Sequence, residues 1–255
     1  MKGIILAGGT GSRLSPLTRV TNKHLLPIYN LPMIYCPIKT LTGTGIDDVL
    51  IVAGREHAER FIELLGSGSE FNTDFTYKIQ DESKGIAHAL GLAKRFANGD
   101  NIAVVLGDNI FENKFDFSNF KEGAKLFLKR VPDAHRFGVA RVRYNAKEEK
   151  NKVVEIVEKP KFEETDNELI DNNGYGFVVT GLYLYDNNVF NFINSLKPSK
   201  RGEYEITDIN NMYIKEGKMD HQIIDGFWSD AGTLESLYQS SSFIRSKSID
   251  KKKLI

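Results

Sequence analysis

The chain has 255 residues, of which 41% are apolar and 27% are charged, fractions that are ordinary for a soluble globular protein. Its 34 lysines and arginines balance its 34 aspartates and glutamates, which argues against a nucleic-acid partner recognised through net charge. The one cysteine, Cys36, excludes an intramolecular disulfide, and no apolar run in the sequence approaches the length of a membrane span. We therefore expect a cytoplasmic protein with no membrane partner, in which Cys36 fills part of the core.

Apolar runs alternate with helical patterns over the first 107 residues. The patterns predict four strands and three helices, the last helix with Ser83 as its N-cap. The predicted strands are 3–7, 48–53, 74–80 and 101–107, and the predicted helices are 32–45, 56–66 and 83–99. Nearly continuous apolar strands separated by helices indicate a doubly wound parallel sheet, whose ligands bind at the carboxyl ends of the strands.

The pattern changes after about residue 135. Residues 137–144 and 152–159 alternate between apolar and polar residues, as expected of an antiparallel pair, and residues 176–186 form a further predicted strand. Residues 207–218 predict a helix that begins at Thr207 and ends at Gly217. The basic segment 245–255 is expected to be a solvated tail.

A glycine-rich loop follows the first predicted strand, in the stretch GIILAGGTGSRLSPL at residues 3–17. Such a loop suits a redox dinucleotide, a triphosphate bound for hydrolysis or a triphosphate bound for transfer. A dinucleotide loop needs a third glycine, but Gly9 and Gly11 are followed by Arg13, and the Gly-Lys-Ser/Thr of a hydrolase loop is absent as well. Arg13 and nearby Lys23 favour a triphosphate, with a plain turn as the alternative.

Two aspartates follow apolar segments that are far apart in the sequence. Asp108 lies in VVLGDNIFE and Asp230 in GFWSDAGTLESL. A pair of carboxylates beside a triphosphate would suit Mg²⁺, although each residue alone could simply lie in a turn. Lys159 and Arg201 are candidate anion contacts or surface charges, and His24 is expected to be structural.

Eight motifs together carry a resemblance to the sugar nucleotidyltransferases. They occur in the family's order between residue 1 and about residue 240. They are LAGGTGSRLSPLT, NKHLLPIYNLPMIY, LGDNIFE, RFGVARV, VEKP, VTGLYLYD, RGEYEITDIN and SDAGTLESL.

The resemblance implies a Rossmann-like α/β nucleotidyltransferase fold with a mostly parallel central sheet, flanked by helices, and an added antiparallel sugar-binding portion. It implies one domain over 1–240, with a nucleotide-binding half at about 1–134, a sugar-phosphate-binding half at about 135–240 and a tail at 241–255. The implied reaction is Mg²⁺-dependent transfer of dTMP from dTTP to glucose 1-phosphate. The family also implies a homo-oligomer, either a tetramer or a dimer.

The resemblance also assigns roles to individual residues. It implies catalytic roles for Arg13, Lys23, Asp108 and Asp230, of which the two aspartates would bind the metal. The implied nucleotide-binding residues are Leu6, Gly8, Gly9, Gly11, Arg13, Gln80, Gly85 and Asp108, with Gln80 and the Gly85 backbone on the thymine. The implied sugar-phosphate residues are Asn109, Gly138, Glu158, Lys159, Thr180, Tyr183 and Arg201.

Four departures from the family pattern leave the substrates open. His24 replaces the usual Gln, Phe137 replaces Tyr, Ala231 replaces Thr, and the segment 161–178 is longer than the family's connection. The alternatives are another sugar 1-phosphate, UTP or CTP in place of dTTP, or a nucleotide sensor without catalysis. Because longer members of the family continue into helices that form a regulatory nucleotide site, we also expect feedback by a dTDP-sugar to be weak or absent.

Overall fold

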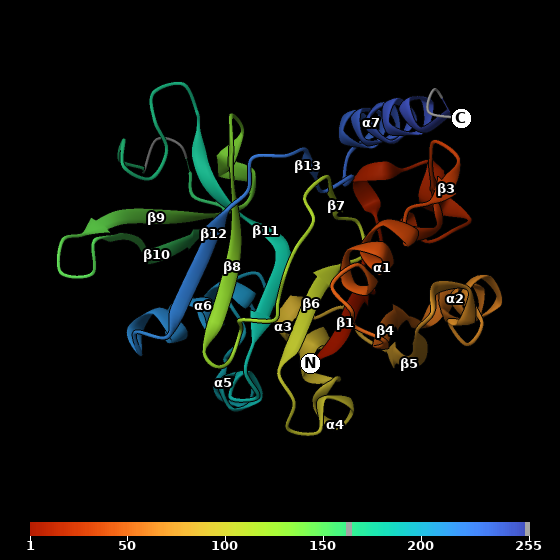
Figure 1. Ribbon diagram of the computed structural model, residues 1–255, viewed down its shortest axis with the longest axis horizontal. Helices are drawn as coiled ribbons and strands as arrows, with labels where there is room; N and C mark the ends of the chain where they lie inside the picture. The colour runs from red at the N-terminus through yellow and green to blue at the C-terminus, as the bar shows by residue number, and fades with distance from the viewer. Residues whose placement is uncertain (162–164, 253–255) are drawn as a thin grey trace. The chain divides into compact units, whose positions relative to one another are not determined.

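The computed structural model describes residues 1–161 and 165–252, so part of the long segment 161–178 and the last residues of the predicted tail lie outside the described residues. The chain folds into two compact units, each assembled from separate stretches (Figure 1). The first unit comprises residues 1–83, 104–117 and the chain from 226 onward, and the second comprises 84–103 and 118–225. These units differ from the predicted halves, because residues 84–103 and 118–134 belong to the second.

The first unit contains the predicted parallel strands. Their order is β6-β1-β4-β5, and β4 pairs in parallel with both β1 and β5. The strands are β1 (Lys2–Ala7), β4 (Asp48–Gly54), β5 (Asp74–Gln80) and β6 (Ile102–Leu106). The apolar residues at the centres of β1 and β4 are buried, as expected for strands covered on both faces.

The helices of the first unit are shorter than predicted at their N-terminal ends. Helix α1 spans Tyr35–Thr42 because Leu31 and Pro32 belong to the small ladder formed by β2 (Pro27–Ile28) and β3 (Leu31–Pro32). Helix α2 spans Ala58–Leu65 and stops at Gly66, as predicted, after the 3-10 turn η4 (Arg55–His57). Cys36 is half-buried against the apolar cluster around Leu14, and burial raises the pKa of its thiol to about 11.

Helix α7 (Leu234–Lys252) runs across the predicted start of the tail at residue 241. Its apolar residues Leu237, Phe243 and Ile244 pack against a buried cluster that includes Leu14 and Met33. The Phe243 ring also stacks on Phe227, with centroids 4.2 Å apart. These contacts attach the helix to the first unit up to Ile244, just before the basic segment 245–255. No helix within the described ranges has the length and apolar character needed to cross a membrane.

The second unit is built around antiparallel strands, as predicted for residues 137–186. Strands β9 and β10 pair antiparallel with a register shift between Val153 and Glu155, and β11 pairs antiparallel with β9 and β8. Two of its strands, β8 and β12, were not predicted. The strands are β8 (Ala124–Val131), β9 (Gly138–Asn145), β10 (Lys150–Glu158), β11 (Gly176–Tyr185) and β12 (Met219–Ile223).

Two predicted helix starts are wrong in the second unit. The predicted helix 83–99 is instead α3 (Ile86–Gly91) followed by α4 (Lys94–Ala97), and Gly85 rather than Ser83 precedes it, with φ +97°. The chain can turn there because glycine accepts that φ, and the Tyr204 carbonyl accepts a hydrogen bond from the Ala87 N–H.

Helix α6 (Ile206–Lys215) has Glu205 at its N-cap position, not Thr207. The Thr207 hydroxyl donates to Glu158 Oε2 instead, over 2.7 Å. Gly217, with φ +69°, follows the helix as predicted. The remaining helix of this unit is α5 (Val189–Ser195).

A side chain of α6 takes the place of a neighbouring strand beside β10. The Ile156 N–H donates to Asn211 Oδ1 over 2.9 Å, and Asn211 Nδ2 donates to the Ile156 carbonyl over 2.8 Å. Both backbone groups of Ile156 are therefore satisfied by one amide, which protects the outer side of β10 and attaches α6 to the sheet.

We predict that Asn211→Ala destabilises the second unit by about 1–3 kcal/mol, because two backbone groups lose their partners. Asn211→Asp should have an intermediate effect, since it keeps the acceptor and loses the donor. The measurement is urea unfolding followed by circular dichroism. Asn191→Ala is the matched control, because that exposed amide donates to Asn188 Oδ1 within the same helix region and satisfies no strand backbone group among the described residues. Equal free energies of unfolding for Asn211→Ala and the control would contradict this account.

Candidate active site

The glycine loop begins where β1 ends, and its glycines make room for Lys23. Gly11 has φ +68°, and a Cβ there would lie 2.8 Å from Lys23 Cβ. A Cβ on Gly9 would lie 3.4 Å from Lys23 Cε. The lysine stem thus runs along the bare backbone of the loop, and the close approach and positive φ at Gly11 explain why that position is glycine.

The end of β5 brings Gln80 to the same loop. A Cβ on Gly8 would collide with Gln80 Oε1, so the amide occupies the space that a side chain would fill. Gln80 is buried, and its Nε2 donates to the Glu82 carbonyl over 3.0 Å. The Leu6 carbonyl accepts from the Gly107 N–H over 2.9 Å, which joins the carboxyl ends of β1 and β6. The residues predicted to bind a nucleotide from β1, β5 and β6 therefore gather at the predicted edge of the sheet.

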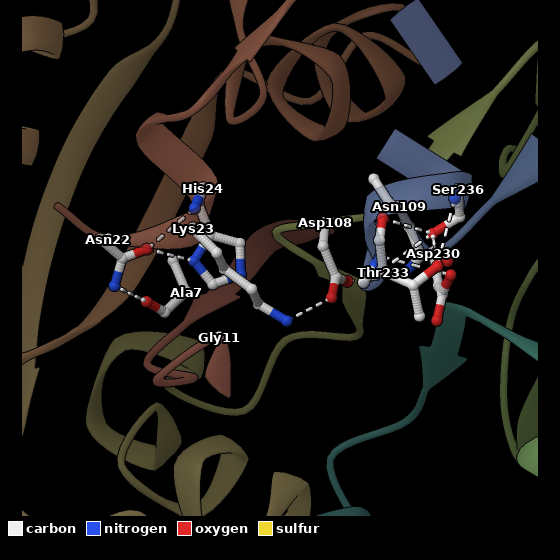
Figure 2. A network of polar contacts seen from close by, with 12 residues as sticks. Ala7, Gly11, Asn22, Lys23, His24, Asp108, Asn109, Asp230, Thr233 and Ser236 are labelled. Carbon is white, nitrogen blue, oxygen red and sulfur yellow. Dashed lines mark hydrogen bonds and ion pairs between the residues drawn. The ribbon is translucent and has the colours of Figure 1, made fainter. Parts of the chain in front are cut away.

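Asp108 forms an ion pair with Lys23 just beyond β6 (Figure 2). Both side chains are largely shielded from solvent, with 11% and 14% of their surfaces exposed. Burial raises the pKa of Asp108, but the positive charge of Lys23 and the hydrogen bonds outweigh this effect, so the pKa is lowered overall. Asp108 is therefore an ionised carboxylate next to the glycine loop.

A two-residue ladder brings the Asp230 segment to Asp108. Strand β7 (Ile110–Phe111) pairs antiparallel with β13 (Trp228–Ser229), with Ser229 opposite Ile110. The residues that follow Ser229 therefore run alongside those that precede Ile110. Asp108 and Asp230 thus both belong to the same end of this ladder, and their role as a metal pair stays a prediction.

Arg13 and Asp230 both lie against Gly232. A Cβ on Gly232 would be 3.1 Å from Arg13 Nη2 and 3.0 Å from Asp230 Oδ2. The Gly232 N–H donates to Asp230 Oδ1 over 3.3 Å. The guanidinium from the loop and the second carboxylate are therefore neighbours.

The donor set suits Mg²⁺ completed by phosphate oxygens. Among the described residues there is no cluster of three or more His, Cys, Asp and Glu side chains that could hold a metal by themselves. Two carboxylates at one end of a ladder, with Asp108 ionised, match a cation that takes one or two carboxylates together with substrate phosphates.

His24 is a buried structural residue, as expected. Its ring Nδ1 lies 2.6 Å from Asn22 Oδ1, which also accepts from the His24 backbone N–H over 2.9 Å (Figure 2). Burial, followed by the charge of Lys23, lowers the pKa of His24 from 6.5 to about 3. His24 is therefore neutral at ordinary pH and adds no positive charge beside Lys23. Asn22, whose role the sequence did not indicate, caps the 3-10 turn η3 (Lys23–Leu25).

The second unit gathers Glu158 and Arg201. Arg201 Nη2 donates to Glu158 Oε1 over 3.3 Å and to Glu205 Oε2 over 2.9 Å. Lys159 Nζ lies 3.6 Å from Glu158 Oε1. A Cβ on Gly138 would lie 3.3 Å from Glu158 Oε2, so that glycine opens space beside the carboxylate. Glu205 was missed in the sequence because it looked like an ordinary helix-start residue.

Other predicted residues of the second unit have different surroundings. Thr180 is fully buried, and its hydroxyl donates to the Phe127 carbonyl over 2.7 Å. Tyr183 is buried and stacks on Tyr185 at 5.8 Å. Both side chains have partners in the core, and their contacts with a sugar stay a prediction. Gly85 lies against the Tyr204 backbone, because a Cβ there would be 2.6 Å from the Tyr204 carbonyl oxygen.

The fold and the first unit's site define an α/β protein with a phosphate-type loop at the carboxyl ends of parallel strands, and with an acidic pair at one end of the β7–β13 ladder. The profile of the nucleotidyl transferase family matches residues 2–247, and the chain belongs to this family.

Characterised relatives agree with that assignment. A glucose-1-phosphate thymidylyltransferase of Neisseria meningitidis is 42% identical over 96% of this chain and 83% of its own length. One of Mycolicibacterium smegmatis is 37% identical over 96% of this chain and 82% of its own length. A Bacillus anthracis crystal structure in complex with sucrose, provisionally named a glucose-1-phosphate thymidylyltransferase, is 48% identical with a TM-score of 0.85, covering 96% of this chain and 95% of its own.

We predict that His24 makes the folded state sensitive to acid. Its folded pKa of about 3 lies below the ordinary 6.5, so the unfolded chain binds the extra proton as the pH falls between these values. Above the unfolded pKa, neutral His24 leaves the free energy of unfolding at its full value. As the pH falls from there toward the folded pKa, the free energy of unfolding decreases by up to about 1.4 kcal/mol per pH unit. His24→Gln, which cannot protonate, should gain about 2 kcal/mol relative to the native chain between pH 6 and pH 4. Urea unfolding across this range measures the difference, and parallel curves would contradict the prediction.

Proposed function

We propose that the chain is a glucose-1-phosphate thymidylyltransferase, which makes dTDP-glucose and pyrophosphate from dTTP and glucose 1-phosphate. The observation that carries this proposal is the 42% identity, over 96% of the chain, to a relative with that name. The site supports it, because Lys23, Arg13 and two aspartates surround a glycine loop of the kind that holds a triphosphate.

The chemistry needs no covalent intermediate with the protein. A phosphate oxygen of the sugar phosphate forms a bond to the α-phosphorus of dTTP, in line with the bridging oxygen to the β-phosphorus. That bridging bond breaks, and its electron pair leaves with pyrophosphate. Enzymes promote such steps mainly by positioning the groups and neutralising charge, which suits a site made of cations, carboxylates and backbone N–H groups.

The first unit is proposed to bind dTTP. The loop from Gly8 to Gly11 would hold the phosphates, with Arg13 on the departing pyrophosphate. Lys23, a compact cation on a flexible stem, would contact the phosphates near the reacting centre. Gln80 would hydrogen-bond to the thymine edge, since an amide offers both a donor and an acceptor. Asp108 and Asp230 would hold Mg²⁺, which when bound supplies further charge neutralisation at the phosphates.

The second unit is proposed to bind the sugar phosphate. Glu158 would accept hydrogen bonds from sugar hydroxyls, and Lys159 and Arg201 would contact the phosphate. Because Arg201 is paired with Glu205 and Glu158, the phosphate would share the guanidinium with these carboxylates.

The long segment 161–178 is the reason to test other sugars and nucleobases. Its described residues Asp166 and Glu168 form ion pairs with Arg141 on β9, at 2.7 and 3.4 Å. Phe137 lacks the hydroxyl that is usual at this position in the family. A different sugar 1-phosphate, or UTP or CTP, is therefore the second candidate.

We also propose a cytoplasmic homo-oligomer that acts early in deoxysugar synthesis for surface polysaccharide. These points follow from the relatives' activity and the family's usual assembly. Light scattering of the purified chain tests the oligomer.

A pyrophosphate-release assay tests the activity directly. The purified chain is incubated with each of dTTP, UTP, CTP and ATP, and with several sugar 1-phosphates. We expect the highest kcat/KM with dTTP and glucose 1-phosphate, and the product should be dTDP-glucose by mass. No turnover with that pair would refute the proposal, and nucleotide binding without turnover of any pair would favour a sensor.

We predict that Asp108→Asn lowers kcat at least about 100-fold, because the substitution removes a charge that metal and phosphate binding require. The amide keeps the size of the carboxylate, so circular dichroism and thermal unfolding should show a folded protein. Asp116→Asn, at an exposed aspartate on the connection after β7, is the matched substitution. Turnover close to that of the native chain would refute the metal-binding role of Asp108.

A further inference from the structure

A chain of hydrogen bonds leads away from Asp108 to the indole of Trp228. Asn109 Nδ2 donates to Asp108 Oδ1 over 2.9 Å. The Trp228 Nε1–H donates to Asn109 Oδ1 over 2.7 Å. Asp108 Oδ2 meanwhile receives Lys23 Nζ, so each oxygen of the carboxylate has a different donor.

The Trp228 indole N–H favours one of the two orientations of the Asn109 side-chain amide. An asparagine amide has nearly the same shape in both orientations, but one end accepts and the other donates. Trp228 can only donate, so it requires Oδ1 and leaves the NH₂ group for Asp108. Without the indole the amide could turn over and place its oxygen against the carboxylate, where it would repel the negative charge.

The position of Trp228 is itself held firmly. Phe227 and Glu112 exchange hydrogen bonds across the end of the β7–β13 ladder, each of 2.9 Å, one of them to the Glu112 side chain. The Phe227 ring stacks on Phe243 of α7. The indole therefore approaches Asn109 from a rigid support, which suits a group that orients another.

We propose that Trp228 is a positioning residue: its N–H fixes the Asn109 amide, which in turn sets the orientation of the Asp108 carboxylate for metal binding. The inference rests on the proposed function of Asp108 as a metal ligand. Outer hydrogen-bond partners of metal ligands typically change metal affinity 10- to 100-fold.

Trp228→Phe separates the hydrogen bond from the packing, because it keeps an aromatic ring and removes the N–H. Mn²⁺ together with dTTP is the probe, measured by electron paramagnetic resonance, because the two carboxylates need phosphate oxygens to complete the donor set. We expect Mn²⁺ affinity to fall about 10-fold and kcat to fall with it, while KM for glucose 1-phosphate is unchanged. Asn109→Ala should cause a similar loss of Mn²⁺ affinity, and the Mn²⁺ affinity of the double variant should be no lower than that of either single variant, because both interrupt the same path.

Phe243→Leu is the matched control for the packing. It weakens the ring stack under the same ladder and touches neither Asn109 nor Asp108, so it should lower stability and leave Mn²⁺ affinity unchanged. Three outcomes would each overturn the proposal. They are an unchanged Mn²⁺ affinity in Trp228→Phe, additive losses of Mn²⁺ affinity in the double variant, and no Mn²⁺ binding by the native chain.

The indole also provides a readout that does not need the metal, because Trp228 is the chain's only tryptophan. Its single indole N–H signal in a ¹H–¹⁵N spectrum should shift upfield in Asn109→Ala, and an unchanged signal would overturn the proposed link. If the native chain makes no dTDP-glucose but Trp228→Phe still weakens Mn²⁺ binding, the proposed function fails and the positioning role stands.

Discussion

The ion pair between Lys23 and Asp108 is the interaction on which the first unit's site depends. Its partners are 85 residues apart, and it fixes the 3-10 turn after the glycine loop to the turn after β6. Because both groups are largely buried, removal of one would leave the other as an uncompensated charge, which is costly. The same lysine stem explains the glycine at position 11, since a Cβ on Gly11 would collide with it. The position of Lys23 therefore restricts both the loop sequence and the partner of Asp108.

The two units distribute charge differently. In the first unit Lys23 pairs with the ionised carboxylate of Asp108 through Oδ2, and Asn109 donates a hydrogen bond to Oδ1 of the same carboxylate. In the second unit Arg201 contacts three carboxylates, those of Glu158, Glu203 and Glu205. These contacts hold the guanidinium in place. Because the three carboxylates neutralise much of its positive charge, the guanidinium attracts a further anion less strongly. Such an arrangement favours a ligand that brings hydroxyl groups as well as phosphate, because hydroxyls can donate to the carboxylates.

The sequence predicted those parts of the structure that follow from local pattern. The strands that flank Gly8 and Asp108 are continuous apolar runs, and their ends carry the predicted residues. The site contacts that depend on tertiary structure could not be predicted. Glu205 and Trp228 looked ordinary in sequence, and only folding places them beside Arg201 and Asn109. The predicted N-cap at Ser83 failed because a backbone carbonyl from Tyr204 serves the start of α3. The tail boundary at residue 241, which came from the extent of the resemblance, left out Phe243 and Ile244, which pack α7 against the first unit.

The β7–β13 ladder has a consequence for the order in which the protein can become functional during synthesis. Its two strands are short, yet they join segments whose side-chain hydrogen bonds span 115 and 119 residues. Closing so large a loop carries a high entropic cost, and contacts of this range generally form late. A ribosome-bound chain that ends before residue 226 contains β1, β4, β5 and β6 but lacks one of the two carboxylates. The nascent protein can therefore build its nucleotide-side sheet well before it has a complete acidic pair.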